Sequence, residues 1–330
     1  MASKNRIDVH QHVVPPVWAA ALPSHGGDPS GWSSPQWTPD SAIAFMDAQQ
    51  IDMGILSLTA PSVTGWKGDA RRDMARRVNE YTAGLVAKRP MRFGNFATLP
   101  LPDVDGALLE IEHAFNTLRA DGVVLLSNYE GHYLGDPVFG PLWAALDRAA
   151  AVVFIHPGKP AIPILPELPG PIVDYPFDTT RTAVHLALHG VLEKYPRVRI
   201  ILAHAGGFLP YAAHRFAKLA AAVRPQGPSA ESLLASFKQF YFDTALSSGS
   251  EQLQSLRSFA GASRILYGSD FPYAPAAVGA AFTSMLDGNE TLFAEEKAAI
   301  NRGNAERIWG HSRFLTEVTQ PRLHARSVAS

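Results

Sequence analysis

Eight short apolar runs recur along this chain of 330 residues, and each of them ends in polar residues. Their apolar stretches are nearly continuous, which is typical of parallel strands that are covered on both faces. Amphipathic stretches with helical spacing fill most of the intervals between them. Eight strand–helix units therefore predict an α/β fold, the (β/α)₈ barrel. The runs are Ile7–His10, Met53–Leu58, Arg92–Thr98, Gly122–Leu126, Val152–His156, Arg199–His204, Phe240–Thr244 and Arg264–Asp270.

Three of the intervening stretches carry clear helix signals, and we expect helices over residues Asp40–Gln50, Asp103–Arg119 and Asp178–Tyr195. The alternative fold is an open, doubly wound sheet, which usually carries a glycine-rich phosphate loop after its first strand. Here the first run ends in His10-Gln11-His12 instead. The barrel is therefore favoured, as one domain over residues 1–330.

Two segments depart from the pattern and predict long loops after the first and fifth strands. Residues Pro15–Pro39 hold three tryptophans, and residues Gly158–Pro176 are rich in proline. Long loops after barrel strands often form the walls of a binding pocket. Surface packing and a subunit contact are alternative roles for both segments.

Composition limits the chemistry. The chain has no cysteine, which excludes disulfides, thiolate metal sites and a cysteine nucleophile. A net charge of −1 gives no reason to expect nucleic acid or an anionic membrane as a partner. The N-terminus lacks the apolar stretch of a secretory signal, and no run is long enough to span a membrane. We expect a soluble, cytoplasmic protein without nucleic-acid or membrane partners.

His10 and His12 stand one residue apart at the end of the first run. Alternate side chains of a strand point to the same face, so the two imidazoles are expected side by side on the face opposite Val9. Two neutral imidazoles on one face can bind a metal ion. A motif this short is by itself more often a pair of ordinary surface histidines.

Other strand ends add similar side chains. The fifth run ends at His156, the sixth at His204 and the eighth at Asp270. The active site of a barrel lies at the carboxyl ends of its strands, so these residues are expected at one mouth with His10 and His12. Folding does not require imidazoles at these ends. Several nitrogen ligands and one carboxylate predict a site for zinc or a similar divalent ion.

The order of these motifs resembles the amidohydrolase superfamily. His-x-His is followed by "HPG" at residue 156, "HAGG" at residue 204 and "GSDFP" at residue 268. Within that superfamily, the chain is similar to the branch of metal-dependent decarboxylases related to aminocarboxymuconate-semialdehyde decarboxylase. The segments Thr117–Pro137 and Ile200–Arg215 resemble the fungal 6-methylsalicylate decarboxylases. The resemblance extends from Ile7 to about Trp309.

The resemblance implies one divalent metal ion, Zn²⁺ with Mn²⁺ as an alternative. Its ligands would be His10, His12, His156 and Asp270, with His204 beside the bound water or substrate. Hydrolytic relatives with two metals carry a carboxylated lysine after a strand. This chain has Ser127-Asn128-Tyr129 after its fourth run, which favours a single metal.

The reaction implied is the non-oxidative decarboxylation of a 2-hydroxybenzoate-type acid. The specific expectation is that 6-methylsalicylate gives 3-methylphenol and CO₂, as part of secondary metabolism, in an enzyme that is a homodimer like related decarboxylases. Asp270 or His204 would deliver the proton to the ring. Two alternatives remain: a metal-dependent hydrolase of lactones or amides on the same scaffold, and a binding protein without activity.

An aromatic acid needs an apolar pocket with a few polar anchors. Trp32, Asn128, Arg215 and Phe271 are the candidate substrate contacts, although ordinary packing explains each of them at least as well. Asp243, at the end of the seventh strand, is expected to support a metal ligand.

Overall fold

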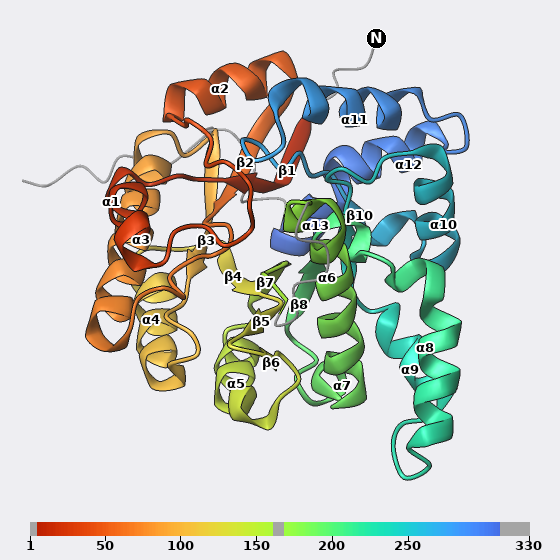
Figure 1. The fold of residues 1–330 in the computed structure, drawn as a ribbon. Coiled ribbons are helices and arrows are strands. Elements are labelled where there is room, and N and C mark those ends of the chain that lie inside the picture. Colours follow the sequence, from red (N-terminus) through yellow and green to blue (C-terminus); the bar gives the residue numbers. More distant parts are fainter. Residues whose placement is uncertain (1–4, 161–167, 311–330) are drawn as a thin grey trace, which may run out of the picture.

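Eight parallel strands form the centre of the molecule and pair in the order β1-β2-β3-β4-β7-β8-β9-β10 (Figure 1). The computed structural model describes residues 5–160 and 168–310. Each of the eight apolar runs overlaps one strand of this sheet. The strands are β1 Arg6–His12, β2 Ile51–Ser57, β3 Phe93–Thr98, β4 Gly122–Leu126, β7 Val152–His156, β8 Arg199–Leu202, β9 Tyr241–Asp243 and β10 Ile265–Leu266.

Backbone hydrogen bonds between β1 and the residues after β10 close the sheet into a barrel. The His12 amide donates to the Phe271 carbonyl at 2.7 Å, and the Asp270 amide donates to the His10 carbonyl at 2.8 Å. Both bonds lie at the carboxyl end of β1, so closure and the predicted mouth coincide. The predicted (β/α)₈ barrel is confirmed.

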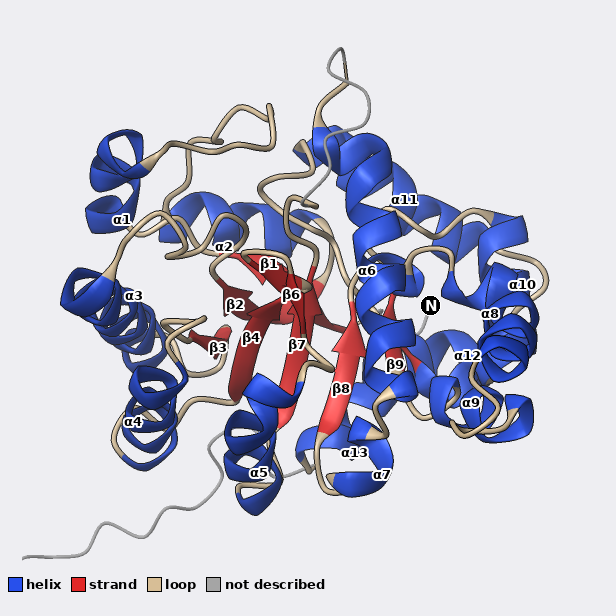
Figure 2. Cartoon of the chain, turned by 60° about the horizontal axis from the view of Figure 1, so that its bottom comes forward, coloured by secondary structure: helices blue, strands red, loops and turns tan. Residues whose placement is uncertain are grey.

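Helices surround the strands (Figure 2), and a short hairpin of β5 (Asn128–Tyr129) and β6 (His132–Tyr133) follows β4. The helices are α1 Pro16–Ala21, α2 Pro39–Ala48, α3 Gly68–Lys88, α4 Val104–Asn116, α5 Gly140–Arg148, α6 Gly170–Leu188, α7 Val191–Lys194, α8 Leu209–Val223, α9 Ala230–Phe237, α10 Ser250–Ala260, α11 Ala276–Gly288, α12 Ala294–Ala298 and α13 Asn304–Trp309.

The strands bury apolar side chains on both faces, as their continuous apolar runs predicted. One cluster fills the barrel and includes Val9, Phe154 and Leu266, and Ile308 of α13 closes it at the amino ends of the strands. A second, larger cluster lies between the strands and the helices. Burying one such large side chain contributes about 2 kcal/mol, so the barrel wall is stabilised from both sides.

The segments after the first and fifth strands contain more helix than the sequence predicted. Helix α1 lies within Pro15–Pro39, and α6 begins at Gly170 rather than at Asp178. The reason is that Asp178 does not cap a helix. Its buried carboxylate accepts hydrogen bonds from the Asn128 amide at 2.7 Å and the Tyr133 hydroxyl at 2.5 Å.

Residues 161–167 of the predicted second loop lie outside the described residues. The prediction of one domain over residues 1–330 extends beyond the described residues and stays a prediction.

A register shift in β1 decides where its histidines point. Between Asp8 and Gln11, three residue steps along β1 match two steps along β2, which is a β-bulge. Val9 therefore lies in the barrel interior, and so does His10, whose ring centroid is 4.8 Å from that of Phe154. The expectation that the motif would lie on the face opposite Val9 was wrong, because simple alternation does not hold across a bulge.

Replacing Asp8 by Ala is predicted to lower the free energy of unfolding by about 3 kcal/mol. The buried Asp8 carboxylate accepts hydrogen bonds from the Ser269 amide (3.1 Å), the Ser269 hydroxyl (2.5 Å) and the His10 amide (3.1 Å). Its loss leaves these donors buried without an acceptor at the barrel seam. Urea unfolding measures the change, with the exposed Asp69→Ala as the control. Equal stability of the two variants would contradict this account of the seam.

Candidate functional site

Five predicted side chains converge at the carboxyl end of the barrel. His10 and His12 belong to β1, His156 ends β7, and His204 and Asp270 follow β8 and β10. His10, His156, His204 and Asp270 each offer a ligand atom, and these atoms all lie within 4.8 Å of one another. Residues far apart in the sequence thus form one cluster.

His12 belongs to the same cluster through two short contacts. Its Nε2 atom lies 3.1 Å from the Nε2 atom of His10 and 3.1 Å from Oδ1 of Asp270. Oδ1 of Asp270 also lies 3.2 Å from Nε2 of His10. Two imidazole nitrogens and a carboxylate oxygen therefore point at a common centre.

The other ring nitrogen of each histidine contacts an acceptor. Carbonyl and carboxylate oxygens only accept, so Nδ1 carries the hydrogen, and in the neutral ring Nε2 offers its lone pair to a metal ion. The contacts are His10 with the Asp243 carboxylate (2.8 Å), His12 with the Ser57 carbonyl (3.2 Å), His156 with the Pro157 carbonyl (2.8 Å) and His204 with the Ala245 carbonyl (3.1 Å).

The charges around these rings favour a cation. Burial lowers the pKa of His12 and His156, which keeps both rings neutral as a metal ligand requires. Burial also opposes a charge on His10, but the carboxylates of Asp243 and Asp270 outweigh it and raise its pKa to about 10. Burial raises the pKa of Asp270, but the charge and hydrogen bond of His10 hold it well below its usual range. Imidazole nitrogens beside buried carboxylates fit a divalent metal ion.

Asp243 positions two members of the cluster from below. Its side chain is fully buried, with Oδ2 on the His10 ring and Oδ1 accepting from the His204 amide at 2.9 Å. That second bond helps hold His204 at a φ of 53°, a backbone conformation that is costly for a residue other than glycine. The expected supporting role of Asp243 agrees with these contacts.

Gly268 leaves room for this arrangement. A Cβ atom at this position would lie 2.9 Å from the Cβ atom of His10 and 3.1 Å from that of Asp243. A side chain there would displace one of the two residues. The glycine that begins "GSDFP" is therefore required by the close approach of the eighth strand to the first.

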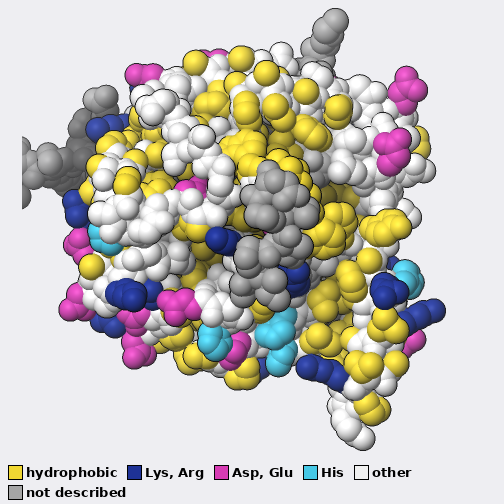
Figure 3. Space-filling view, in the orientation of Figure 1, with side chains coloured by type: hydrophobic (Ala, Val, Ile, Leu, Met, Phe, Trp, Pro, Cys, Tyr) yellow, Lys and Arg dark blue, Asp and Glu magenta, His cyan; other side chains and the backbone are white. Residues whose placement is uncertain are grey.

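A cavity of about 470 Å³ lies above the cluster, and we call it the histidine cavity. His156, His204 and Asp270 lie on its floor. Its walls include the aromatic side chains of Trp32, Tyr175, Phe208, Tyr273 and Phe282. Figure 3 shows hydrophobic side chains around the centre of the molecular face shown there, with basic and acidic side chains largely toward the rim. The volume suits a small, largely apolar ligand.

The predicted substrate contacts fare differently. Trp32 lines the histidine cavity, where its indole N–H donates to the Tyr273 carbonyl at 3.1 Å. Asn128 lines a neighbouring cavity, and its amide nitrogen is bound to Asp178. Two predictions need correction. Phe271 is buried and stacks on Phe45, because the barrel closure turns it into the helix layer, and Arg215 lies exposed on α8, outside the cavity lining.

Sequence reasoning missed several residues around the site. Tyr175 lines both cavities, and Asp28 lies in the wall of the histidine cavity. Asp178 is buried and accepts hydrogen bonds from Asn128 of β5 and Tyr133 of β6. Asp28 stands in a glycine-rich loop, which could have marked it as a candidate. Asp178 gave no such signal, since an aspartate in a helical pattern is usually exposed.

The amidohydrolase family model matches residues 7–311. This chain belongs to the amidohydrolase family. Two fungal relatives are each 43% identical to it. The 6-methylsalicylic acid decarboxylase of Penicillium expansum aligns over 91% of this chain and 94% of its own length. The decarboxylase yanB of Aspergillus niger aligns over 92% and 87%.

A solved structure of a relative carries a metal. The dihydroxybenzoic acid decarboxylase of Polaromonas sp. JS666, with bound manganese and the inhibitor 2-nitroresorcinol, superposes with a TM-score of 0.75. It is 25% identical to this chain, and the match covers 94% of this chain and 97% of that one.

Among the described residues of this chain, no helix is long and apolar enough to cross a membrane.

The two overlapping ligand sets make opposite predictions. The set implied by the family resemblance includes His12 and leaves His204 beside the metal. The group whose ligand atoms all lie within 4.8 Å of one another contains His204 instead of His12. We expect His12→Ala to lose bound metal and His204→Ala to keep it. Metal content after gel filtration, measured by atomic spectroscopy, tests this, and each variant is the control of the other. Loss of metal from His204→Ala alone would assign the ligand role to His204.

Proposed function

We propose that this chain is a metal-dependent, non-oxidative decarboxylase of 2-hydroxybenzoate-type acids, which converts 6-methylsalicylate to 3-methylphenol and CO₂. The observation that carries the proposal is the cluster of four histidines and Asp270, of which His156, His204 and Asp270 form the floor of an aromatic-walled cavity. The two fungal relatives, which are named as decarboxylases, support the reaction type.

We propose that His10, His12, His156 and Asp270 hold one divalent ion. When bound, such an ion would attract the substrate carboxylate and phenolate oxygens and would favour the ionised phenol near neutral pH. Zinc is the predicted ion, and the manganese in the Polaromonas relative supports manganese as the alternative. A homodimer, a cytoplasmic location and a place in secondary metabolism stay predictions from the sequence.

The aromatic walls would orient the ring of the substrate. Trp32 and Tyr273 lie on the side of the loops after β1 and β10, and Phe208 contributes from the segment that leads into α8. Aromatic walls shield the ring from water, and the floor supplies the imidazole and carboxylate groups. The carboxyl-bearing carbon would thus face His204 and Asp270.

The chemical difficulty is the aryl–carboxylate bond. Loss of CO₂ before protonation would leave a carbanion in the ring plane, where its charge cannot delocalise. We propose that Asp270, which is ionised, takes the phenolic proton and delivers it to the carboxyl-bearing carbon. The carbon–carboxylate bond then breaks, its electrons restore the aromatic ring, and CO₂ leaves. The phenolate takes a proton from solvent. His204 is the alternative donor.

Asp270→Asn is predicted to reduce turnover by at least ~100-fold, because an amide cannot carry the proton. Turnover of 6-methylsalicylate and metal content are measured on the same sample. The control is Asp47→Asn, a surface residue paired with Arg92. Near-normal turnover by a metal-loaded Asp270→Asn protein would exclude Asp270 as the proton donor.

The reaction itself is tested with the purified protein, as isolated and after removal of metal by a chelator. We expect 3-methylphenol only when Zn²⁺ or Mn²⁺ is present, and recovery of activity when the ion is added back. Chromatography follows the phenol, and trapping in base follows the CO₂. Hydrolysis of lactones or amides without CO₂ release would instead support the hydrolase alternative.

A further inference from the structure

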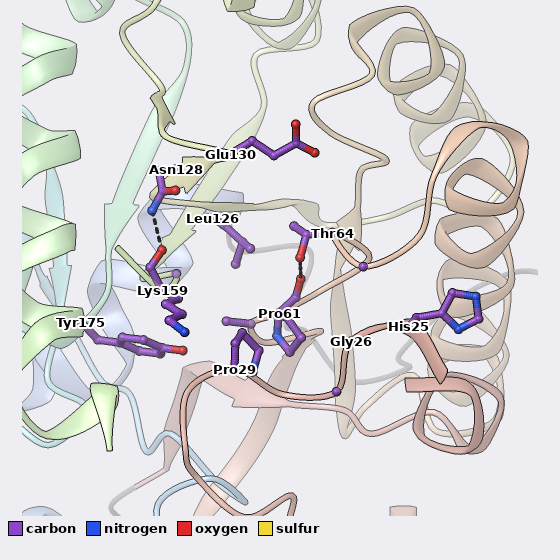
Figure 4. Close-up of a pocket in the computed structure, with 14 residues that line it drawn as sticks. His25, Gly26, Pro29, Pro61, Thr64, Leu126, Asn128, Glu130, Lys159 and Tyr175 are labelled. Atoms are coloured by element: carbon purple, nitrogen blue, oxygen red, sulfur yellow. Dashed lines mark hydrogen bonds between the residues drawn. The ribbon is translucent and has the colours of Figure 1, made fainter. Parts of the chain in front are cut away.

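A second cavity of about 300 Å³ lies beside the histidine cavity (Figure 4), and we call it the side cavity. Residues from the loops after β1, β2, β4 and β7 line it. It shares Ala60 and Tyr175 with the histidine cavity, so the two spaces adjoin through these residues. The proposed reaction assigns no role to the side cavity.

The side cavity contains one strongly basic side chain. Of the described residues that line either cavity, Lys159 is the only lysine or arginine. Figure 4 shows its ammonium group and the Tyr175 hydroxyl on the same side of the space, with Pro29 and Pro61 across from them. Lys159 is exposed, so an incoming ligand can reach it from solvent.

The acidic side chains that the structure describes near Lys159 form no ion pair with it. Glu130 points away from Lys159 in Figure 4 and pairs with Arg71 at 3.3 Å. Burial raises the pKa of Asp28, and the nearby charge of Lys159 lowers it by a smaller amount. Within residues 5–160 and 168–310, however, no ion pair joins Lys159 to any carboxylate.

The backbone of Lys159 is held in place, although its side chain forms no ion pair with a described residue. The Asn128 amide donates to the Lys159 carbonyl at 3.1 Å, and the same amide donates to the buried Asp178 at 2.7 Å. Asn128 therefore fixes the position from which the lysine extends. This contact gives Asn128 a positioning role, and the substrate contact expected from the sequence stays a prediction.

We propose that the side cavity is a capture subsite, in which Lys159 binds the carboxylate of the aromatic acid before the acid enters the histidine cavity. This inference rests on the proposed function, because it takes a carboxylic acid as the substrate and a phenol as the product. A hydroxybenzoate is an anion at neutral pH. A phenol, whose pKa is about 10, is neutral. Lys159 thus attracts the substrate and not the product.

The test compares Lys159→Met with wild type as metal-loaded enzyme. The KM for 6-methylsalicylate should rise about fivefold, the size expected for a partly exposed charge, while kcat stays unchanged. The inhibition constant of 3-methylphenol should not change. Rising ionic strength should increase the KM of wild type but not that of Lys159→Met, since salt screens exposed charges.

Two further variants serve as controls. Lys159→Arg keeps the charge and should behave like wild type. Lys88→Met removes an exposed lysine at the end of α3, which leads into β3 at the opposite end of the barrel, and should change nothing. Thermal unfolding of all variants monitors the fold.

Three outcomes would overturn the capture subsite: an unchanged KM in Lys159→Met, an equal salt response in both proteins, or an equal loss of affinity for acid and phenol. Lack of turnover by wild type would instead reject the proposed function. In that case, titration of tryptophan fluorescence in the metal-loaded proteins with the acid and the phenol still decides the subsite. Equal acid affinity of wild type and Lys159→Met would reject it.

Discussion

The bulge in β1 is the constraint on which the site depends. A regular strand that packs Val9 inside the barrel would turn His10 toward the helices. One extra residue between Asp8 and Gln11 brings both Val9 and His10 inside. The first strand thus contributes to the apolar interior and to the histidine cluster within four residues. Bulges beside active sites commonly re-aim a side chain in this way.

Buried carboxylates make this arrangement stable and give it its charge. Asp8 joins the bulged strand to Ser269 across the seam of the barrel, and Asp243 holds the ring of His10 and the backbone of His204. Burial opposes a charge on His10, but the carboxylates of Asp243 and Asp270 outweigh it and raise its pKa to about 10. The same negative charge attracts a metal cation, which must displace the proton of His10 when it binds. Fold closure and metal affinity therefore depend on the same few side chains.

The two cavities have different roles in the proposed function, one in substrate capture and one in bond cleavage. The histidine cavity has aromatic walls and polar groups on its floor, where bond cleavage is proposed. The side cavity carries the ammonium group of Lys159, which is exposed to solvent. The Asn128 side chain donates hydrogen bonds to the Lys159 carbonyl and to the buried Asp178 of α6. These bonds anchor the backbone of Lys159 to the segment after β4 and to α6. Substrate attraction and chemistry are then assigned to different residues.

The sequence by itself determined the eight strands and the residues that end them, because apolar runs and strand-end positions are local patterns. The convergence of His156, His204 and Asp270 follows from the barrel, whose parallel strands all end at one mouth. Tertiary structure decided the rest. The bulge beside His10 is a matter of pairing between strands, which no local pattern reveals. Asp178 reads as a helix start in the sequence, but burial beside Asn128 makes it an acceptor within a longer helix. Tertiary packing also decided that Phe271 is buried, that Arg215 lies outside the cavity lining and that Lys159 reaches the side cavity. The residues that surround each of them are distant in sequence, so local propensity does not predict them.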